Sequence, residues 1–339
     1  MPVRASRCVP EPMPYLPFRL LALPLALLAT VAPAHAEWYE REEAIMGTRV
    51  AVQLWATDPE LAGRAIDAVM ADMRRTDELM STYKPDSQLS QVNAHAYERP
   101  VQVDADIIDV VEKSLEYSRL SDGAFDITYA SVGYLYDYRA HVHPTEAQIA
   151  SALKAVDYRQ LSVDREARTI RFLQPGMRID LGGIAKGWSV DRGVEILKQF
   201  GIEHAMVNAG GDTRLLGDRR GKPWIVGIRD PRKDGVVVAR IPLQNEALST
   251  SGDYERYFEE DGVRYHHILV PGTGRSPGAV RSVTIIAPTA TRTDGLTKPV
   301  FILGVERGME FVRRVGGVEA VIVDAEGRIF YSPGLEPAN

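Results

Sequence analysis

Apolar side chains recur every three to four residues in several stretches of the chain, the spacing typical of amphipathic helices. One such helix is predicted to begin after Asp58, because aspartate caps helix starts and Pro59 fits the first turn. A second is predicted from Asp104 to Ser121, with Gly123 just past its end. Further helices are predicted to begin near four residues: Thr145, Ile184, Arg292 and Glu306.

Other stretches alternate apolar and polar positions, as half-buried strands do. Residues 37–56 alternate loosely, with an interruption at Met46-Gly47-Thr48, and strand-like segments dominate residues 205–270. Asp261-Gly262 is a typical hairpin turn, and a final hairpin is predicted through residues 324–327. Helices that flank mainly antiparallel strand pairs predict an α+β fold.

The first 36 residues have the features of a cleaved secretory signal. Three arginines precede an apolar run at residues 20–31, and Ala34-His35-Ala36 forms a small-x-small cleavage site. The alternative is an uncleaved anchor, although the run is short for a membrane span. The predicted organisation is a signal peptide, residues 1–36, and one compact mature domain, residues 37–339.

Composition is consistent with a soluble protein exported to the periplasm. The single cysteine, Cys8, precedes the apolar run instead of following the cleavage site, which argues against a lipoprotein and leaves the mature chain without a disulfide. The formal net charge is -6 and no basic residues cluster, which argues against DNA or any other nucleic acid as a partner.

A short apolar run that ends at Asp180 passes through Gly182 and Gly183 into a segment of helical period. Glycine at such a junction lets the backbone approach a ligand, and the N–H groups of a helix start attract phosphate. Lys186 falls in the first turn, where a cation opposes the helix dipole unless it meets an anion. Two interpretations stay open at this point: a phosphate-binding turn, or a tight turn with a solvated lysine.

Signatures of several common enzyme classes are absent from the sequence. It contains no GxSxG elbow, no Walker phosphate loop, no HExxH and no Cys/His zinc spacing. The adjacent His266 and His267 are, as a pair, more often structural than metal-binding. Small clusters of Gly, Asp, Ser or Thr occur instead at residues 46–48, 81–90, 123–128, 180–187, 250–254 and 266–274.

Taken together, these clusters resemble the ApbE family, the FAD:protein FMN transferases. The motifs that carry the resemblance are MGT, TYxPxSxLSxxN, GAFD, DLGGIAKG, NAGGD with STSGDYERYF, and HIxxPxTG followed by the helix of Asp294. They run in the family's order from Met46 to about Gly304. The resemblance implies an ApbE-like fold of antiparallel sheets flanked by helices. It also implies an exported enzyme that cleaves FAD and leaves FMN esterified to a threonine or serine of an acceptor subunit in a membrane redox complex.

The resemblance further implies roles for individual residues. His267 would stand at the chemistry, with Lys186 and Asp294 as further catalytic residues. Mg²⁺ would be held, weakly, around the Gly183 carbonyl and the Asp294 carboxylate, with Thr297 and Lys298 beside it, since magnesium prefers hard oxygen ligands. The FAD site would be lined by Met46, Tyr83, Ala124, Phe125, Asp126, Asp180, Lys186, His267 and Ile268.

Two positions depart from the family pattern. Val270 stands where many members have an aspartate, and Lys298 stands where many have a threonine four residues after the metal-binding aspartate. Positions four apart share a helix face, so Lys298 would point at the metal that Asp294 holds. Two alternatives to the transferase therefore remain: an FAD pyrophosphatase that releases FMN and AMP, or a periplasmic FAD-binding protein with a degenerate metal site. The protein is expected to be a monomer or a homodimer.

Overall fold

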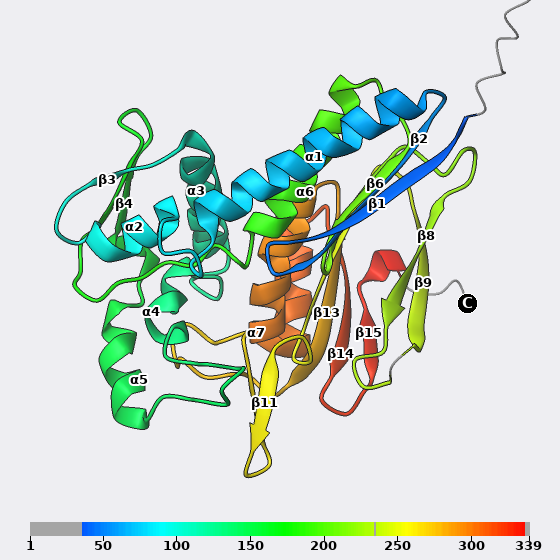
Figure 1. The fold of residues 1–339 in the computed structure, drawn as a ribbon. Helices are drawn as coiled ribbons and strands as arrows, with labels where there is room; N and C mark the ends of the chain where they lie inside the picture. The colour runs from blue at the N-terminus through cyan, green and yellow to red at the C-terminus, as the bar shows by residue number, and fades with distance from the viewer. Residues whose placement is uncertain (1–35, 234, 336–339) are drawn as a thin grey trace, which may run out of the picture. The chain divides into compact units, whose positions relative to one another are not determined.

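Eight antiparallel strands form the main sheet of the structure, a computed structural model that describes residues 36–233 and 235–335 (Figure 1). Their order across the sheet is β1-β2-β6-β7-β10-β13-β14-β15. The predicted signal peptide, apart from Ala36, lies outside the described residues. The strands are β1 (Glu37–Ile45), β2 (Thr48–Ala56), β6 (Ala205–Ala209), β7 (Asp212–Leu216), β10 (Ala247–Gly252), β13 (Val280–Ala287), β14 (Glu319–Asp324) and β15 (Ile329–Tyr331).

Three long helices pack on one face of this sheet (Figure 1). Val52 and Leu54 of the second strand are fully buried against Ala65 and Val69, which lie on the apolar stripe of the first helix. Their burial removes apolar surface from water, the main favourable contribution to folding. The three helices are α1 (Pro59–Met80), α6 (Ala185–Gln199) and α7 (Ala290–Val315).

A separate two-stranded hairpin, β8 (Trp224–Arg229) with β9 (Val237–Leu243), covers the opposite face of the main sheet. Successive side chains of a strand point to opposite faces. Accordingly Ile285 packs with the helices, while its neighbour Ile286 packs with Trp224 of the hairpin. Both faces of the sheet are therefore covered, and β13 is buried almost throughout.

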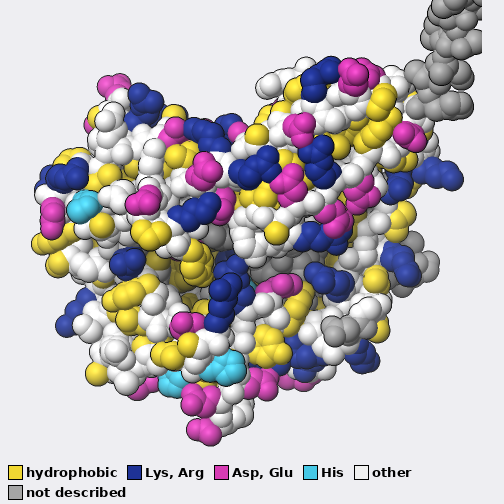
Figure 2. Space-filling model, in the orientation of Figure 1, with side chains coloured by type: hydrophobic (Ala, Val, Ile, Leu, Met, Phe, Trp, Pro, Cys, Tyr) yellow, Lys and Arg dark blue, Asp and Glu magenta, His cyan; other side chains and the backbone are white. Residues whose placement is uncertain are grey.

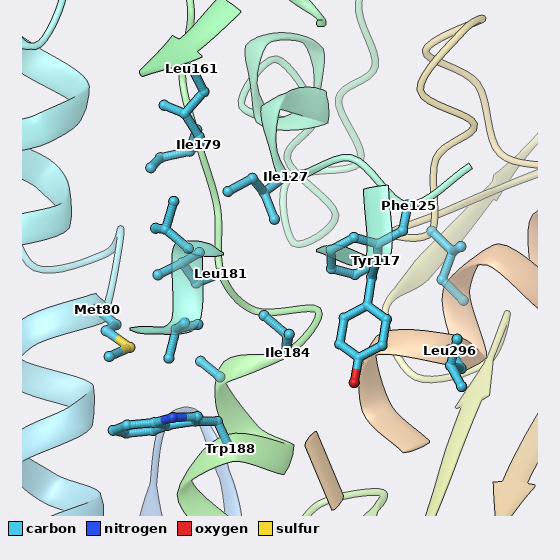
Figure 3. Packing of buried hydrophobic residues seen from close by; sticks show 14 of the residues in the cluster. Met80, Tyr117, Phe125, Ile127, Leu161, Ile179, Leu181, Ile184, Trp188 and Leu296 are labelled. Atoms are coloured by element: carbon cyan, nitrogen blue, oxygen red, sulfur yellow. The ribbon is translucent and has the colours of Figure 1, made fainter. Parts of the chain in front are cut away.

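A second group of elements packs beside α6 and α7 and shares a continuous apolar core with them. In Figure 3 Tyr117, Phe125 and Leu296 lie close together in this core, with Ile184 nearby. The helices here are α2 (Gln88–His95), α3 (Ala105–Leu120), α4 (Ala130–Gly133) and α5 (Glu146–Ala152). The strands are β3 (Val101–Gln102), β4 (Leu161–Asp164) and β5 (Thr169–Phe172), with a further hairpin of β11 (Tyr257–Glu260) and β12 (Val263–His266). Four 3₁₀ turns are η1 (Ile127–Tyr129), η2 (Leu153–Ala155), η3 (Tyr158–Gln160) and η4 (Pro333–Leu335).

The helix starts predicted from the sequence are confirmed. Asp58, Asp104 and Thr145 each accept a backbone N–H at the start of α1, α3 and α5. The two helices predicted near residues 292 and 306 are joined as α7, which is interrupted at Gly304 by a positive φ of 79°. No helix in the described part of the chain is both long and apolar enough to cross a membrane.

The antiparallel pairing confirms the α+β prediction, and both predicted hairpin turns are present. Two helices, α2 and the short α4, were not predicted from the sequence. The structure begins α2 at Gln88, where the hydroxyl of Ser87 accepts the N–H of Ser90 at 3.0 Å. A serine at this position is an ordinary helix cap, so the signal was present in the sequence.

Candidate active site

The turn at residues 180–186 connects the core to the start of α6. The carboxylate of Asp180 accepts the backbone N–H of Gly182 at 2.8 Å and the hydroxyl of Thr82 at 3.1 Å. These bonds join the turn to the loop that carries Tyr83. Ile184, the residue before α6, has an apolar side chain and cannot cap the helix. The backbone N–H groups of the first turn therefore donate no hydrogen bond to the cap side chain.

Lys186 lies in that first turn and points into a buried group of charges. Its Nζ bonds to the carboxylate of Asp212 and lies 3.7 Å from the Oδ2 atom of Asp294. The same Oδ2 accepts the N–H of Gly187 at 3.1 Å, and Oδ1 pairs with Lys298. Asp212 is 2% exposed and Asp294 is fully buried, while the side chains of Lys186 and Lys298 are 26% and 18% exposed, so two partly buried lysines pair with two buried carboxylates. The interpretation of Lys186 as a solvated lysine is therefore wrong.

Burial and mutual charge set the protonation of this cluster. Burial, and then the charge of Asp294, raise the pKa of Asp212. Burial alone would do the same to Asp294, but Lys186 and Lys298 hold the pKa of Asp294 below its usual value. Burial opposes the charge on Lys186, yet the two carboxylates raise the pKa of Lys186. Lys186 is therefore cationic at neutral pH.

The residues predicted around Mg²⁺ come together, and the Asp294 carboxylate among them is already bonded within the protein. Gly183 lies beside Lys298, whose Cε is 3.7 Å from the position a Cβ of Gly183 would take. Both oxygens of Asp294 are bonded, and the hydroxyl of Thr297 accepts from Ser251 at 2.8 Å and donates to the Asp294 carbonyl. An ammonium group is no ligand for a cation. Among the described residues, no group of three His, Cys, Asp or Glu side chains is arranged to hold a metal ion.

His267 follows strand β12 and differs from its neighbour His266. The Nε2 atom of His266 contacts the Pro277 carbonyl at 2.9 Å, so His266 has a structural role. The Nδ1 atom of His267 is buried without a hydrogen-bond partner among the described residues. Burial, and then the charges of His266, Arg256 and Lys298, lower the pKa of His267 to about 3. The ring is therefore neutral at physiological pH and can accept a proton.

The aromatic residues predicted to line the FAD site have different surroundings. Tyr83 is 84% exposed and offers an open ring face. Phe125 is 5% exposed and packs edge-to-face on Tyr117, with its ring 3.4 Å from the position a Cβ of Gly183 would take (Figure 3). Phe125 thus packs against the glycine turn inside the core, whereas the ring of Tyr83 is available to a ligand.

The structure shows that four other predicted lining residues also differ in accessibility. Met46 adopts a positive φ of 55° in the β1–β2 turn and contacts Ser189 of α6 through its sulfur at 3.9 Å. Ala124 is partly exposed, while Ile268 is 4% exposed. Asp126 is buried, caps η1 by accepting the N–H of Thr128, and also accepts the N–H of Tyr158 in η3.

Comparison with known proteins identifies the family of the chain. The model of the ApbE family matches residues 46–322. The chain belongs to the ApbE family. Among curated relatives, it is 33% identical to an FAD:protein FMN transferase of Treponema pallidum and 34% identical to one of Vibrio cholerae, covering 89% of each relative.

Solved structures of the ApbE family share the fold. The ApbE protein of Thermotoga maritima superposes with a TM-score of 0.82 at 35% identity, covering 88% of this chain and 98% of that one. The flavin transferase ApbE of Vibrio cholerae superposes with a TM-score of 0.80 at 29% identity, covering 90% of this chain and all of the other. The predicted ApbE-like fold is thereby confirmed.

Two residues of the site in this ApbE-family chain were not predicted from the sequence. Asp212, at the end of the NAGGD motif, is the closest partner of Lys186. Arg256, in the STSGDYERYF motif, lies close enough to His267 and Lys186 for its charge to act on the pKa of both. Both residues belong to family motifs that are visible in the sequence, but their proximity to Lys186 is visible only in the folded structure.

Proposed function

We propose that this chain is an FAD:protein FMN transferase, which moves FMN from FAD to a threonine or serine of an acceptor protein. The observation that carries the proposal is the buried cluster of Lys186, Asp212, Asp294 and Lys298 at the start of α6, beside a neutral His267. Its family relatives at about one-third identity are named as enzymes of this activity.

The reaction exchanges one phosphorus–oxygen bond for another. The acceptor hydroxyl oxygen forms a bond to the phosphorus of the FMN half, and the anhydride bond to the AMP half breaks. AMP departs with the electron pair, and the hydroxyl proton passes to a base. Positioning and neutralisation of charge supply most of the catalysis of such a transfer.

His267 is the group best suited to accept that proton. Its ring is neutral above about pH 3, and its Nδ1 atom lacks a partner among the described residues. A ring with so low a pKa is a weak base, but an anionic pyrophosphate beside it favours the protonated form. Substrate binding therefore strengthens the base where it is needed.

Lys298 pairs with Asp294 at the position where the family resemblance expects magnesium. The Asp294 carboxylate is already paired, so the arrangement here fits no divalent ion without displacement of Lys298. We therefore assign no step of the reaction to a metal. We therefore expect FMN transfer by this protein to depend only weakly on magnesium.

The protein is proposed to act in the periplasm on an acceptor protein. The Ala34-His35-Ala36 site behind an apolar run supports export to the periplasm, and the acceptor is then a subunit of a membrane redox complex with a domain exposed there. The mature protein is expected to act as a monomer or a homodimer.

Incubation of the mature protein with FAD, magnesium and a candidate acceptor domain tests the function. Mass spectrometry is expected to show FMN added to a threonine or serine of the acceptor, with AMP released in equal amount. Release of free FMN and AMP with an unmodified acceptor would indicate the pyrophosphatase instead. Intact FAD bound to the protein would indicate the degenerate flavin-binding protein. A reaction with His267→Ala provides the matched control for background hydrolysis.

A further inference from the structure

The β11–β12 hairpin begins after Arg256 and ends before His267. Tyr257 pairs with His266 in the hairpin, and the N–H of His267 donates to the carbonyl of Arg256 at 3.1 Å. Arg256 and His267 are thus the next pair along the same antiparallel ladder. Residues opposite each other on paired strands present their side chains on the same face. The base of the hairpin therefore presents an arginine and a histidine together.

The backbone at this position is firmly held. Asp253, which is 6% exposed, accepts from the guanidinium of Arg232 at 2.7 Å and lies 3.6 Å from that of Arg264 in β12. The N–H of Asp253 also donates to the Arg281 carbonyl of β13 at 3.0 Å. These contacts fix the start of the hairpin to the main sheet. The direction in which Arg256 leaves the backbone is thus set before any ligand binds.

The guanidinium of Arg256 reaches the predicted FAD site without being paired. Its Nη2 atom lies 3.6 Å from the position a Cβ of Gly47 would take, beside Met46. Within residues 36–233 and 235–335 its side chain makes no hydrogen bond and no ion pair, unlike Arg232 and Arg264 nearby. Figure 2 shows Lys and Arg side chains in the middle of the face drawn, above the hairpin.

The balance of charge explains why an unpaired arginine matters here. Lys186 and Lys298 are matched by Asp212 and Asp294, so this cluster offers little net charge to a ligand. The pyrophosphate of FAD carries two negative charges and needs cations that are not already neutralised. A guanidinium presents a planar fork of donors that suits phosphate oxygens.

We propose that Arg256 binds the pyrophosphate of FAD and holds it beside His267. This inference rests on the proposed function for its substrate. It assigns the phosphate-binding charge to a residue at the base of the hairpin instead of to the lysines of the cluster. The lysines and carboxylates of that cluster then shape the floor of the site, while Arg256 closes on the phosphates from the side of the β1–β2 turn.

Binding of two flavins to variants of the mature protein tests this role. FAD carries the pyrophosphate, whereas riboflavin carries the same ring and ribityl chain without a phosphate. Arg256→Gln is expected to weaken FAD binding by about tenfold or more, the usual effect of losing a hydrogen bond to a charged group. Riboflavin binding should stay within about twofold. Arg256→Lys should restore part of the FAD affinity, because it keeps the charge but not the fork.

Arg64→Gln is the matched control, since Arg64 is an exposed arginine of α1 whose nearest carboxylate, that of Glu60, is 4.0 Å away. Dissociation constants come from flavin fluorescence, with circular dichroism to confirm the fold of each variant. FAD affinity unchanged in Arg256→Gln would overturn the inference, and so would an equal loss for FAD and riboflavin. A wild type that binds FAD in an Arg256-dependent way but transfers no FMN would sink the proposed function and leave this inference standing.

Discussion

Lys298 is bonded to Asp294, one helical turn earlier on α7. Its Nζ donates to the Asp294 carbonyl oxygen at 3.1 Å and forms an ion pair with the carboxylate Oδ1. Spacing of four residues places two side chains on one helix face, so this pairing follows from the sequence. The ammonium group of Lys298 therefore pairs with the carboxylate that the family resemblance assigns to magnesium.

Replacement of Lys298 by threonine is expected to tighten magnesium binding and make FMN transfer strictly dependent on the metal. Two unit charges 4 Å apart repel by about 4 kcal/mol at an effective dielectric constant of 20. A divalent ion would feel more repulsion, although Lys298 can swing aside and reduce it. The measurement is FMN transfer against magnesium concentration for the wild type and Lys298→Thr.

Asp294→Ala serves as the control in the same titration. Loss of this carboxylate should remove any effect of magnesium and leave Lys186 and Lys298 with fewer partners. A wild type that already needs tightly bound magnesium, with Lys298→Thr no different, would show that Lys298 leaves Asp294 when substrate binds and does not replace the metal.

Local signals in the sequence were sufficient to predict where the longer helices begin. Asp58, Asp104 and Thr145 cap helices through bonds to residues two or three positions away, so each start could be identified from its own neighbourhood. The order of strands was not predictable in this way. Strand β7 lies between β6 and β10, and its pairing with β10 joins residues more than thirty positions apart.

In the site, too, local features could be predicted from the sequence, whereas contacts between distant residues could not. Gly183 and Lys186 lie in one short motif, which identified the turn at the start of α6. Asp212 is 26 positions from Lys186 and Arg256 is farther still, and only the folded sheet brings them near. The local pattern showed that a cation stands at a helix start, where it needs an anion. It could not show that the protein supplies that anion itself.

Gly187→Ala is expected to destabilise the protein, because α6 and α7 meet closely at this residue. An added Cβ would lie 2.3 Å from the Ala290 carbonyl oxygen and 2.7 Å from the Asp294 Cβ. Such overpacking costs about 1–3 kcal/mol and would push Lys186 away from Asp294. Urea unfolding measures the loss of stability, and an FAD titration should show weaker binding in the same variant.

Gly63→Ala is the control for this substitution, since nothing lies within 4 Å of its added Cβ. Gly63 lies inside α1, where alanine favours the helix, so this variant should gain about 0.5–1 kcal/mol. Equal stability of the two variants would show that α6 can move from α7 at little cost.

Export can be tested independently of catalysis. The mature protein is expected to begin at Glu37 and to appear in the soluble periplasmic fraction, because a small-x-small site follows the apolar run. N-terminal sequencing of material released by osmotic shock decides this. A chain that still begins at Met1 and sediments with the membranes would contradict it.

His267 is expected to remain neutral until strongly acidic pH in the ligand-free protein. Burial, and then the charges of His266, Arg256 and Lys298, lower the pKa of His267 to about 3, against about 6.5 for an unfolded histidine. Between these two values the unfolded chain binds one more proton than the folded chain at this site. Stability that is fully present above about pH 6.5 is therefore lost as the pH falls towards 3.

Histidine NMR over a pH titration measures this directly, with His267→Gln identifying the resonance. The midpoint should lie well below 5, or below the pH at which the protein unfolds. Bound FAD should raise the titration midpoint of His267, because the pyrophosphate anion stabilises the neighbouring imidazolium. In parallel urea titrations, His267→Gln should lose less stability than the wild type between pH 6.5 and 4. A midpoint near 6.5 that FAD does not move would show that the ring is solvated and far from the phosphates, and His267 could then not be the base.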